Sequence, residues 1–321
     1  MASKPKVYVT RNVPEAVAER LHRDYEAQVH TADTGLSADD IVAGAEGKDA
    51  IIVTPPDKMT AEVIDRLPTS IKAIGCFSVG TNHVDLDAAK RRGIVVTNTP
   101  GVLTEATADI AMLLLLGACR RAHEGASLIR AGEWQGWKPT QLMGVEVTTR
   151  RLGILGMGRI GQALAHRARG FGMEIHYFDQ QRVRAESELG ATFHDTPESL
   201  LGVSDILSIH VPATPETIGF LNAERIAKLP DNAVVVNTAR GDIVEDEALI
   251  DALKRGKLFA AGLDVFAGEP NIHPEYYKLD NAFILPHLGS ATVETRNAMG
   301  FMVLDNLDAV FGGTAPPNRV A

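Results

Sequence analysis

Three side chains in the second half of the chain could together carry out acid–base chemistry on a small organic acid. Arg240 lies in "VVVNTARGD", Glu269 in "GLDVFAGEP" and His287 in "FILPHLGS", and each follows an apolar run. A guanidinium offers two parallel donors to a carboxylate, an imidazole exchanges protons near neutral pH, and a nearby carboxylate stabilises the protonated imidazole. These residue types predict a catalytic constellation.

Each of the three also has a purely structural interpretation. A single histidine near a strand end is usually a structural residue. Arg240 could form a surface ion pair with Asp242 or Glu245. Glu269 could be a turn residue that precedes a proline. The other motifs of the chain have to decide between these interpretations.

A glycine motif earlier in the chain predicts a dinucleotide site. "LGILGMGRIG" places Gly156, Gly158 and Gly161 in the spacing G-x-G-x-x-G, between a predicted strand and a predicted helix. Glycines there let the backbone approach a pyrophosphate and let the helix pack on the strand. The first helical turn, with Arg159 and Ile160, would direct its N–H groups at the phosphates. Outside this context, the motif would fit any tight turn between a strand and a helix.

The residue at the end of the next strand indicates which dinucleotide binds. Asp179 ends "MEIHYFD", at about the 20-residue spacing of the acidic residue that binds ribose hydroxyls. Its charge would repel the 2′-phosphate of NADP, so the sequence favours NAD. Arg182 and Arg184 keep NADP as an alternative, because arginines can pair with a phosphate; otherwise they form a solvated basic turn.

Predicted strands and helices alternate along almost the whole chain, which is typical of parallel sheets covered by helices on both faces. The alternation breaks near residue 100, at "TNTPG", and resumes after residue 144. The sequence therefore predicts an α/β protein with two doubly wound parallel-sheet domains, the second a Rossmann dinucleotide-binding domain. Ligands of such sheets bind outside the carboxyl ends of the strands, where Arg240, Glu269 and His287 are expected.

The composition limits the possible partners. The chain has 321 residues and a net charge of −9, which argues against nucleic acid or an anionic membrane as the main partner. Cys76 and Cys119 allow neither a disulfide framework nor a zinc motif, so we predict no metal site. The longest apolar run is too short to span a bilayer, and the N-terminus has no secretory apolar core. We expect a cytoplasmic protein that binds a small molecule.

These motifs occur in the order found in the D-isomer-specific 2-hydroxyacid dehydrogenases, and the chain resembles this family over most of residues 70–300. The resemblance rests on "GILGMGRIGQALA", "YFD", "VVVNTARGDIV", "GLDVFAGEP" and "PHLGS". It is closest to the branch of glycerate dehydrogenases and hydroxypyruvate (glyoxylate) reductases, through "ADIAMLLLLGACRRAHEG", "WQGWKP" and "HLGSATVETR". The resemblance implies reduction of hydroxypyruvate or glyoxylate to D-glycerate or glycolate by hydride transfer from NADH.

The resemblance also implies a division of labour. His287 would be the general acid in reduction, Glu269 would hold its imidazole, and Arg240 would bind the carboxylate and the keto oxygen of the substrate. The backbone at Ser78, Val79 and Gly80 would add a cradle for the carboxylate. Beside the glycine motif and Asp179, the residues expected at the NAD molecule are Thr107, His210, Val211, Pro212, Thr217, Thr238, Ala239, Arg240, Asp264, His287, Gly289 and Ser290, with Asp264 at the nicotinamide carboxamide.

The family further implies a substrate-binding domain of residues 1–100 plus 291–321 and an NAD-binding domain of residues 101–290. Segment 120–148 of the second domain would form the interface of a homodimer. It contains Trp134 and Trp137, which could pack in the core or in a subunit interface, where tryptophan is enriched. In related reductases a tryptophan of this segment reaches the active site of the partner, and Trp137 is the candidate here for contact with substrate.

Other functions stay open from the sequence alone. A transcriptional corepressor lineage shares the fold and uses dinucleotide binding for assembly. A 3-phosphoglycerate dehydrogenase and a reductase that prefers NADPH are further alternatives, although a phosphorylated substrate would need more cations than we identify. The preferred 2-keto acid depends on the shape of the pocket, and neither it nor the physiological direction follows from these residues.

Overall fold

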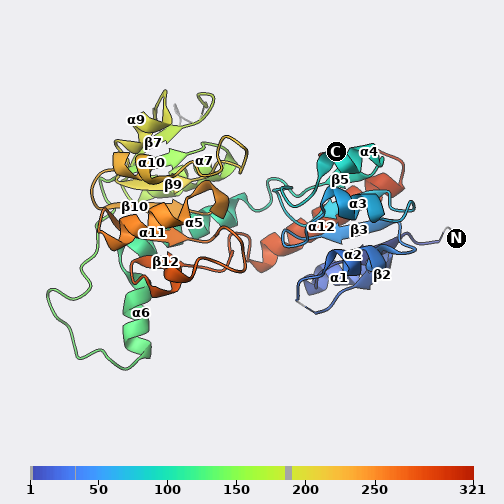
Figure 1. The fold of residues 1–321 in the computed structure, drawn as a ribbon, viewed down its shortest axis with the longest axis horizontal. Coiled ribbons are helices and arrows are strands. Elements are labelled where there is room, and N and C mark those ends of the chain that lie inside the picture. The colour runs from blue at the N-terminus through green and yellow to red at the C-terminus, as the bar shows by residue number, and fades with distance from the viewer. Residues whose placement is uncertain (1–2, 33, 185–189) are drawn as a thin grey trace. The chain divides into compact units, whose positions relative to one another are not determined.

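The computed structural model describes residues 3–32, 34–184 and 190–321. The chain divides into two compact units, Met1–Leu103 with Ser290–Ala321 (unit 1) and Thr104–Gly289 (unit 2). The boundaries expected at residues 100 and 291 lie within three residues of these. The predicted fold class is confirmed, because each unit contains a parallel sheet with helices packed against it (Figure 1).

Unit 1 is built on a five-stranded parallel sheet in the order β2-β1-β3-β4-β5. Its strands are Lys6–Val9 (β1), Glu26–Val29 (β2), Ala50–Val53 (β3), Ala73–Cys76 (β4) and Val95–Thr97 (β5). Every residue of β3 and β4 is buried, as expected of strands that are covered on both faces.

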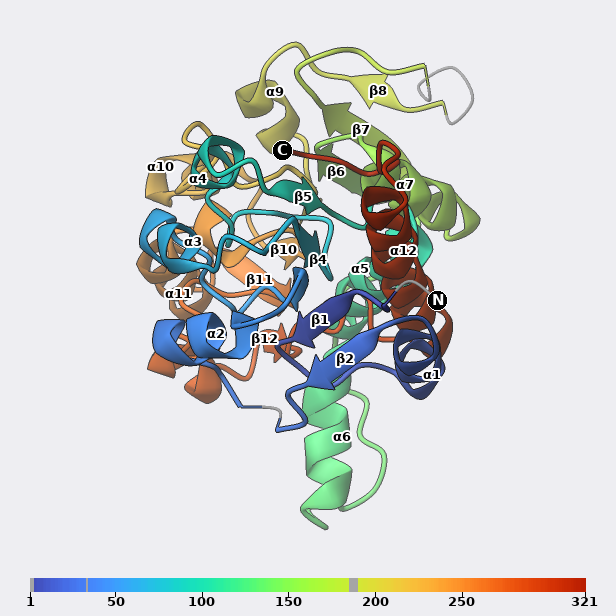
Figure 2. The ribbon, with the colours of Figure 1, turned by 90° about the vertical axis from the view of Figure 1, so that its right-hand side faces the viewer.

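Helices cover both faces of this sheet. They are Glu15–Asp24 (α1), Ala38–Ala45 (α2), Ala61–Arg66 (α3), Leu86–Arg91 (α4) and Val293–Phe311 (α12). Figure 2 shows α1 and α12 on one side of the sheet and α2, α3 and α4 on the other, and each group buries its own apolar cluster. α12 packs so closely that a Cβ at Gly300 would lie 2.4 Å from Cγ2 of Val17. The last helix of the chain thus completes the core of the N-terminal unit.

Unit 2 is built on a seven-stranded parallel sheet in the order β12-β11-β10-β9-β6-β7-β8. Its strands are Arg151–Leu155 (β6), Glu174–Phe178 (β7), Thr192–Phe193 (β8), Ile206–Ile209 (β9), Ala233–Asn237 (β10), Leu258–Leu263 (β11) and Ala282–Ile284 (β12). The chain winds outward from β6 to β7 and β8, then returns to β9 and winds the other way. Ligands of doubly wound sheets bind at this reversal, outside the carboxyl ends of the strands.

The helices of unit 2 also lie on both faces of its sheet. They are Thr104–Cys119 (α5), Ala122–Arg130 (α6), Arg159–Gly170 (α7), Pro197–Leu201 (α9), Ala223–Lys228 (α10) and Asp246–Lys254 (α11), with 3₁₀ turns at Gly241–Ile243 (η1) and Pro274–Lys278 (η2). α5 and α7 share one apolar cluster with the sheet, and α9, α10 and α11 share the other. α5 ends before Arg121, which has a left-handed φ of 51°.

α6 and the segment that follows it contribute little to the core. α6 has no buried residue, and the irregular chain that follows α6 exposes Trp134 and Trp137. In Figure 1 this part of unit 2 extends away from the sheet. Among the described residues, no helix is long and apolar enough to cross a bilayer.

Candidate active site

The glycine motif forms a tight turn between β6 and α7. Gly156 has φ +95°, and a Cβ there would lie 2.9 Å from the backbone carbon of His210 and the backbone nitrogen of Val211. A Cβ at Gly161 would lie 2.3 Å from the carbonyl oxygen of Gly156. Both positions therefore require glycine, one for backbone conformation and close approach, the other for helix packing. α7 begins directly after Gly158, so its first N–H groups have no partner within the helix.

Asp179 is fixed beside this turn. It follows β7, and its Oδ2 accepts the N–H of Met157 at 2.8 Å. The carboxylate is thereby held next to the glycine loop; the selection of the ribose by Asp179 stays a prediction. The guanidinium of Arg182 lies 5.7 Å over the ring of Phe193. A cation–π contact therefore engages one of the two arginines that could pair with the 2′-phosphate of NADP.

The loop after β9 closes the other side of the glycine turn. His210 and Val211 are the residues that approach Gly156, and Nε2 of His210 lies 2.8 Å from Oγ of Ser208. Burial lowers the pKa of His210 to about 4, so its ring is neutral at physiological pH. Further along, Oγ1 of Thr217 donates to the carbonyl of Pro212 at 2.6 Å. Pro212 and Thr217 are thus joined by a hydrogen bond, and His210 and Val211 lie against Gly156.

His287 and Glu269 form a hydrogen-bonded pair. Nδ1 of His287 lies 2.7 Å from Oε2 of Glu269, and the two side chains are 40% and 33% exposed. Oε1 of Glu269 accepts the N–H of Phe266 at 2.7 Å. Burial alone would raise the pKa of Glu269, but His287, the Phe266 N–H and the charge of Arg240 together hold it below its ordinary value. Glu269 is therefore a carboxylate at neutral pH.

Arg240 lies on the neighbouring turn, after β10. Burial lowers its pKa, while the charges of Glu269 and Asp242 oppose that shift, and the guanidinium stays charged because its ordinary pKa is so high. Within the described residues no ion pair joins Arg240 to Asp242 or Glu245, the structural alternative. A Cβ at Gly241 would lie 1.8 Å from the backbone carbon of Phe266. Only glycine lets the Arg240 turn sit this close to the loop that carries Glu269.

Asp264, Thr107 and Gly289 meet at the turn after His287. Asp264 is 1% exposed, and its two oxygens accept the N–H groups of Leu288 at 2.6 Å and Gly289 at 2.7 Å. Oγ1 of Thr107 donates to the carbonyl of Gly289 at 3.1 Å. These contacts hold the turn; the nicotinamide contact expected of Asp264 stays a prediction. Ser290 belongs to unit 1.

In unit 1, the loop after β4 contains the predicted carboxylate cradle. Oγ of Ser78 donates to the carbonyl of Gly80 at 2.7 Å, and the amide of Asn98 donates to the carbonyl of Val79 at 2.8 Å. In the part of the chain that the structure describes, no hydrogen bond uses the N–H of Val79 or Gly80. The loop is fixed through its carbonyls, which leaves these amides as donors for an anion.

The sheet order of unit 2 places the candidate residues in one row. Six neighbouring strands, from β12 to β7, end at the same edge. In that order the residues that follow them are His287, Asp264 with Glu269, Arg240, His210, Gly156 with Gly158, and Asp179. His287, Glu269 and Arg240 thus lie at one end of the row, the glycine turn lies at the switch point, and Asp179 lies beyond it.

Comparison with known proteins identifies the family. Residues 112–289 match the family model for the NAD-binding domain of D-isomer specific 2-hydroxyacid dehydrogenases. A glycerate dehydrogenase from Hyphomicrobium methylovorum is 49% identical over 97% of both chains. A glyoxylate reductase from Thermococcus litoralis is 42% identical over 99% of this chain and 97% of that protein. The chain belongs to the D-isomer specific 2-hydroxyacid dehydrogenases. The predicted family is therefore confirmed, and the protein is an NAD(P)-dependent oxidoreductase.

A solved structure supports the same assignment for this dehydrogenase. The NADPH-dependent glyoxylate/hydroxypyruvate reductase from Sinorhizobium meliloti superposes with a TM-score of 0.87 at 35% identity, covering 99% of this chain and 98% of that one. This similar enzyme is described as NADPH-dependent.

The site of the dehydrogenase fits NAD, the cofactor of the matched domain. A Cβ at Gly158 would meet no atom within 4 Å, so a phosphate can approach the backbone at the start of α7. Oγ1 of Thr238 is buried and has no hydrogen-bond partner among the described residues. Such a group is expected to pair with a ligand or water. Thr238 and Ala239 lead into Arg240, at the position predicted for the cofactor.

Two residues that shape the site were not predicted from the sequence. The side chain of Asn237, 1% exposed, bonds to the backbone of Ala239 and Arg240. Gly241 permits the close approach of the neighbouring loop. Asn237 does leave a signal, since it is a polar residue that closes the apolar run "AVVV"; the need for glycine at 241 depends on a loop distant in sequence.

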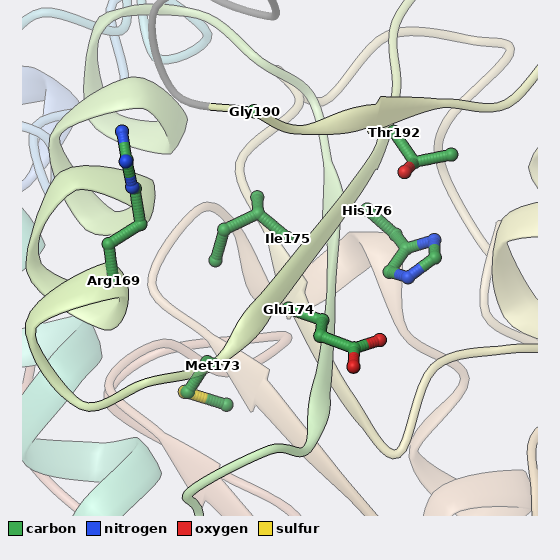
Figure 3. A pocket seen from close by; sticks show the side chains of 7 residues that line it. All are labelled: Arg169, Met173, Glu174, Ile175, His176, Gly190 and Thr192. Carbon is green, nitrogen blue, oxygen red and sulfur yellow. The ribbon is translucent and has the colours of Figure 1, made fainter.

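Trp137 lies apart from the row of site residues. Its side chain is 81% exposed, in the segment that extends from unit 2. A pocket that Figure 3 shows also lies apart: Glu174, Ile175 and His176 of β7 line it, at the start of the strand, whereas Asp179 follows the end. The pocket is therefore not part of the candidate site.

Proposed function

We propose that this dehydrogenase reduces hydroxypyruvate and glyoxylate to D-glycerate and glycolate with NADH, with His287 as the general acid. The observation that carries the proposal is the 2.7 Å contact between Nδ1 of His287 and Oε2 of Glu269, next to the turn of Arg240. Similarity to a glycerate dehydrogenase and to a glyoxylate reductase, at 49% and 42% identity, supports these substrates.

The residues suggest how the reaction proceeds. Bound NADH supplies the hydride that reduces the C2 carbonyl. Arg240 binds the carboxylate and polarises the keto oxygen through its paired donors. Because Nδ1 of His287 is engaged with Glu269, Nε2 is the ring nitrogen that holds the transferable proton, and it protonates the keto oxygen as negative charge develops there. In the reverse direction the neutral ring accepts the hydroxyl proton.

Unit 1 has the substrate-binding role in this proposal, and unit 2 binds the cofactor. The N–H groups of Val79 and Gly80, with the side chain of Ser78 fixing their loop, are donors suited to the substrate carboxylate. The NAD contacts predicted for Thr107, Thr217, Gly289 and Ser290 belong to the proposal as well. Replacing Gly80 by Pro would remove one donor and should raise KM for the keto acid while the dissociation constant of NADH stays unchanged.

NADH is proposed to be the preferred coenzyme because of Asp179. Its carboxylate is anchored to the glycine loop through Met157 and would face a 2′-phosphate with like charge. The Sinorhizobium relative is described as NADPH-dependent, so the preference has to be measured on this chain.

We further propose that the protein is a homodimer formed through segment 120–148. α6 has no buried residue, and Ile129, Trp134, Trp137 and Met143 are 52–81% exposed. Monomers rarely expose such a group of large apolar side chains without an interface. Light scattering should give twice the mass of one chain, and Trp134→Ala with Trp137→Ala should weaken the dimer. We also propose a cytoplasmic location, because the two free thiols are buried and suit a reducing compartment.

The first experiment measures steady-state oxidation of NADH and NADPH with hydroxypyruvate, glyoxylate, pyruvate and phenylpyruvate, alongside His287→Ala. We expect a preference for NADH and for hydroxypyruvate and glyoxylate, and a loss of about 10²–10⁴-fold in kcat in the variant. Tight dinucleotide binding without turnover of any keto acid would reject the enzyme proposal and favour a corepressor-like binding protein. Activity restricted to phosphorylated 3-carbon substrates would favour a phosphoglycerate dehydrogenase.

A further inference from the structure

The turns that carry Arg240 and His287 are joined through the strand between them. Arg240 follows β10 and His287 follows β12, and β11 lies between these two strands in the sheet. Asn237 closes β10, and Asp264 follows β11 directly. Both are 1% exposed, so their hydrogen bonds are shielded from water.

Asn237 fixes the turn that ends in Arg240. Its Nδ2 donates to the carbonyl of Arg240 at 2.8 Å, and its Oδ1 accepts the N–H of Ala239 at 2.9 Å. The side chain therefore closes the turn with one donor and one acceptor, as a pair of backbone hydrogen bonds would. The turn in turn sets the direction in which the Arg240 side chain leaves the backbone. An asparagine is required here, because a donor and an acceptor are both used.

Asp264 connects this turn to the one after His287. Its N–H donates to the carbonyl of Asn237 at 3.0 Å. Its carboxylate accepts both N–H groups that follow His287, those of Leu288 and Gly289. Asn237 and Asp264 thus form a continuous hydrogen-bonded bridge between the backbone of Arg240 and the backbone next to His287, which has a left-handed φ of 56°.

We propose that Asn237 and Asp264 are positioning residues that hold the Arg240 guanidinium and the His287 imidazole at a fixed separation. The inference rests on the proposed function, in which one 2-keto acid must meet both groups at once. A shift of about 1 Å between such groups can cost about a hundredfold in rate. Neither residue has to touch the substrate for this role, because each acts through a backbone turn.

The test is a double-mutant cycle of Asn237→Ala and Arg240→Ala. If Asn237 acts through Arg240, Asn237→Ala lowers kcat/KM for hydroxypyruvate by about a hundredfold in the wild type but by less than about threefold in the Arg240→Ala background. Oxamate is an unreactive analogue of the keto acid. Its dissociation constant, measured in the presence of NADH, should follow the same pattern. The dissociation constant of NADH alone should not change.

Asn306→Ala is the matched control. Asn306 is 0% exposed and, in unit 1, its side chain also bonds to backbone groups, the carbonyl of Met302 and the N–H of Asn318. We expect this variant to lose stability. Its effect on kcat/KM should be the same in the wild type and in the Arg240→Ala background. If Asn237→Ala does not fold, Asn237→Asp replaces it. The carboxylate still accepts the N–H of Ala239, but it has no donor for the carbonyl of Arg240.

Asp264→Asn separates the bridge from direct cofactor binding. An amide keeps one acceptor and turns an N–H₂ group toward the second backbone N–H, so the turn after His287 loosens. We expect kcat to fall while the dissociation constant of NADH is retained. Equal effects of Asn237→Ala in both backgrounds would overturn the role of Asn237, and a loss confined to NADH affinity would overturn that of Asp264. Both results are distinct from failure of the proposed function, in which the wild type itself would not turn over 2-keto acids.

Discussion

Nδ1 of His287 donates to Oε2 of Glu269 at 2.7 Å, while the other oxygen of Glu269 accepts the N–H of Phe266. With both of its oxygens engaged, the carboxylate cannot rotate away from the ring. The contact fixes the tautomer of His287, because a carboxylate can only accept a hydrogen bond and Nδ1 must therefore carry a proton. In the proposed reaction the transferable proton therefore belongs to Nε2.

Glu269→Gln should slow reduction of the keto acid. Burial alone would raise the pKa of Glu269, and the contact with His287 is the main interaction that lowers it. The amide keeps the size of the side chain but removes its charge, so the charge-assisted hydrogen bond that orients the imidazole becomes weaker. At about pH 7.5, kcat/KM for reduction should fall about tenfold to a hundredfold.

The measurement for this variant is kcat/KM for hydroxypyruvate, alongside the dissociation constant of NADH, which should stay unchanged. A kcat/KM equal to that of the wild type would mean that the contact between Glu269 and His287 does not support proton transfer.

Asp179→Asn should relax the preference for NADH. The asparagine keeps an oxygen that can accept the N–H of Met157, so the glycine loop stays in place, but the negative charge is gone. We expect kcat/KM with NADPH to rise about tenfold or more, because like-charge repulsion of a 2′-phosphate is removed. Asp179→Ala is the companion variant: it also deletes the loop contact and should weaken binding of both coenzymes. Unchanged coenzyme ratios in both variants would show that another residue selects the ribose.

The sequence predicted where the candidate residues lie better than the contacts that arrange them. His287, Glu269 and Arg240 could be placed at neighbouring strand ends because each follows an apolar strand, and parallel strands end at a shared edge. Gly156, Gly158 and Asp179 could be found because their spacing follows from one strand–turn–helix unit. The left-handed backbone at Arg121, which separates α5 from α6, leaves no mark in the apolar pattern.

Contacts between segments distant in sequence could not be predicted in this way. The bonds from Asp264 to Leu288 and Gly289 join residues 24 and 25 positions apart, and nothing in either segment specifies the other. Asn237 was overlooked because a polar residue at a strand end has many possible partners.

His210→Asn should reduce the loss of stability on mild acidification. Burial lowers the pKa of His210 to about 4 in the folded protein, against about 6.5 in an unfolded chain. Between these values the unfolded state binds a proton that the folded state does not, so stability falls as the pH drops from about 6.5 towards 4. Above pH 6.5 both states are neutral and His210 contributes no pH dependence.

Urea unfolding at pH 7.5 and pH 5 tests this. The wild type should lose up to about 2 kcal/mol more unfolding free energy between the two conditions than His210→Asn does. Other histidines titrate in both proteins and cancel in the difference. The asparagine retains a polar group for Ser208, so the comparison isolates the titration. Equal pH slopes would contradict the assignment of a buried neutral ring at this position.

Gly156→Ala and Gly158→Ala should separate folding from cofactor binding in the same loop. At Gly156 the backbone has φ +95° and a Cβ would lie 2.9 Å from backbone atoms of the loop after β9, so alanine should destabilise unit 2 by about 1–3 kcal/mol and weaken NADH binding.

At Gly158 a Cβ meets no atom of the protein within 4 Å, so the melting temperature of Gly158→Ala should be close to that of the wild type. The methyl group nevertheless stands where the backbone opens to a phosphate, and the dissociation constant of NADH, measured by fluorescence titration, should rise at least tenfold. Wild-type affinity in Gly158→Ala would place the pyrophosphate away from the N-terminus of α7.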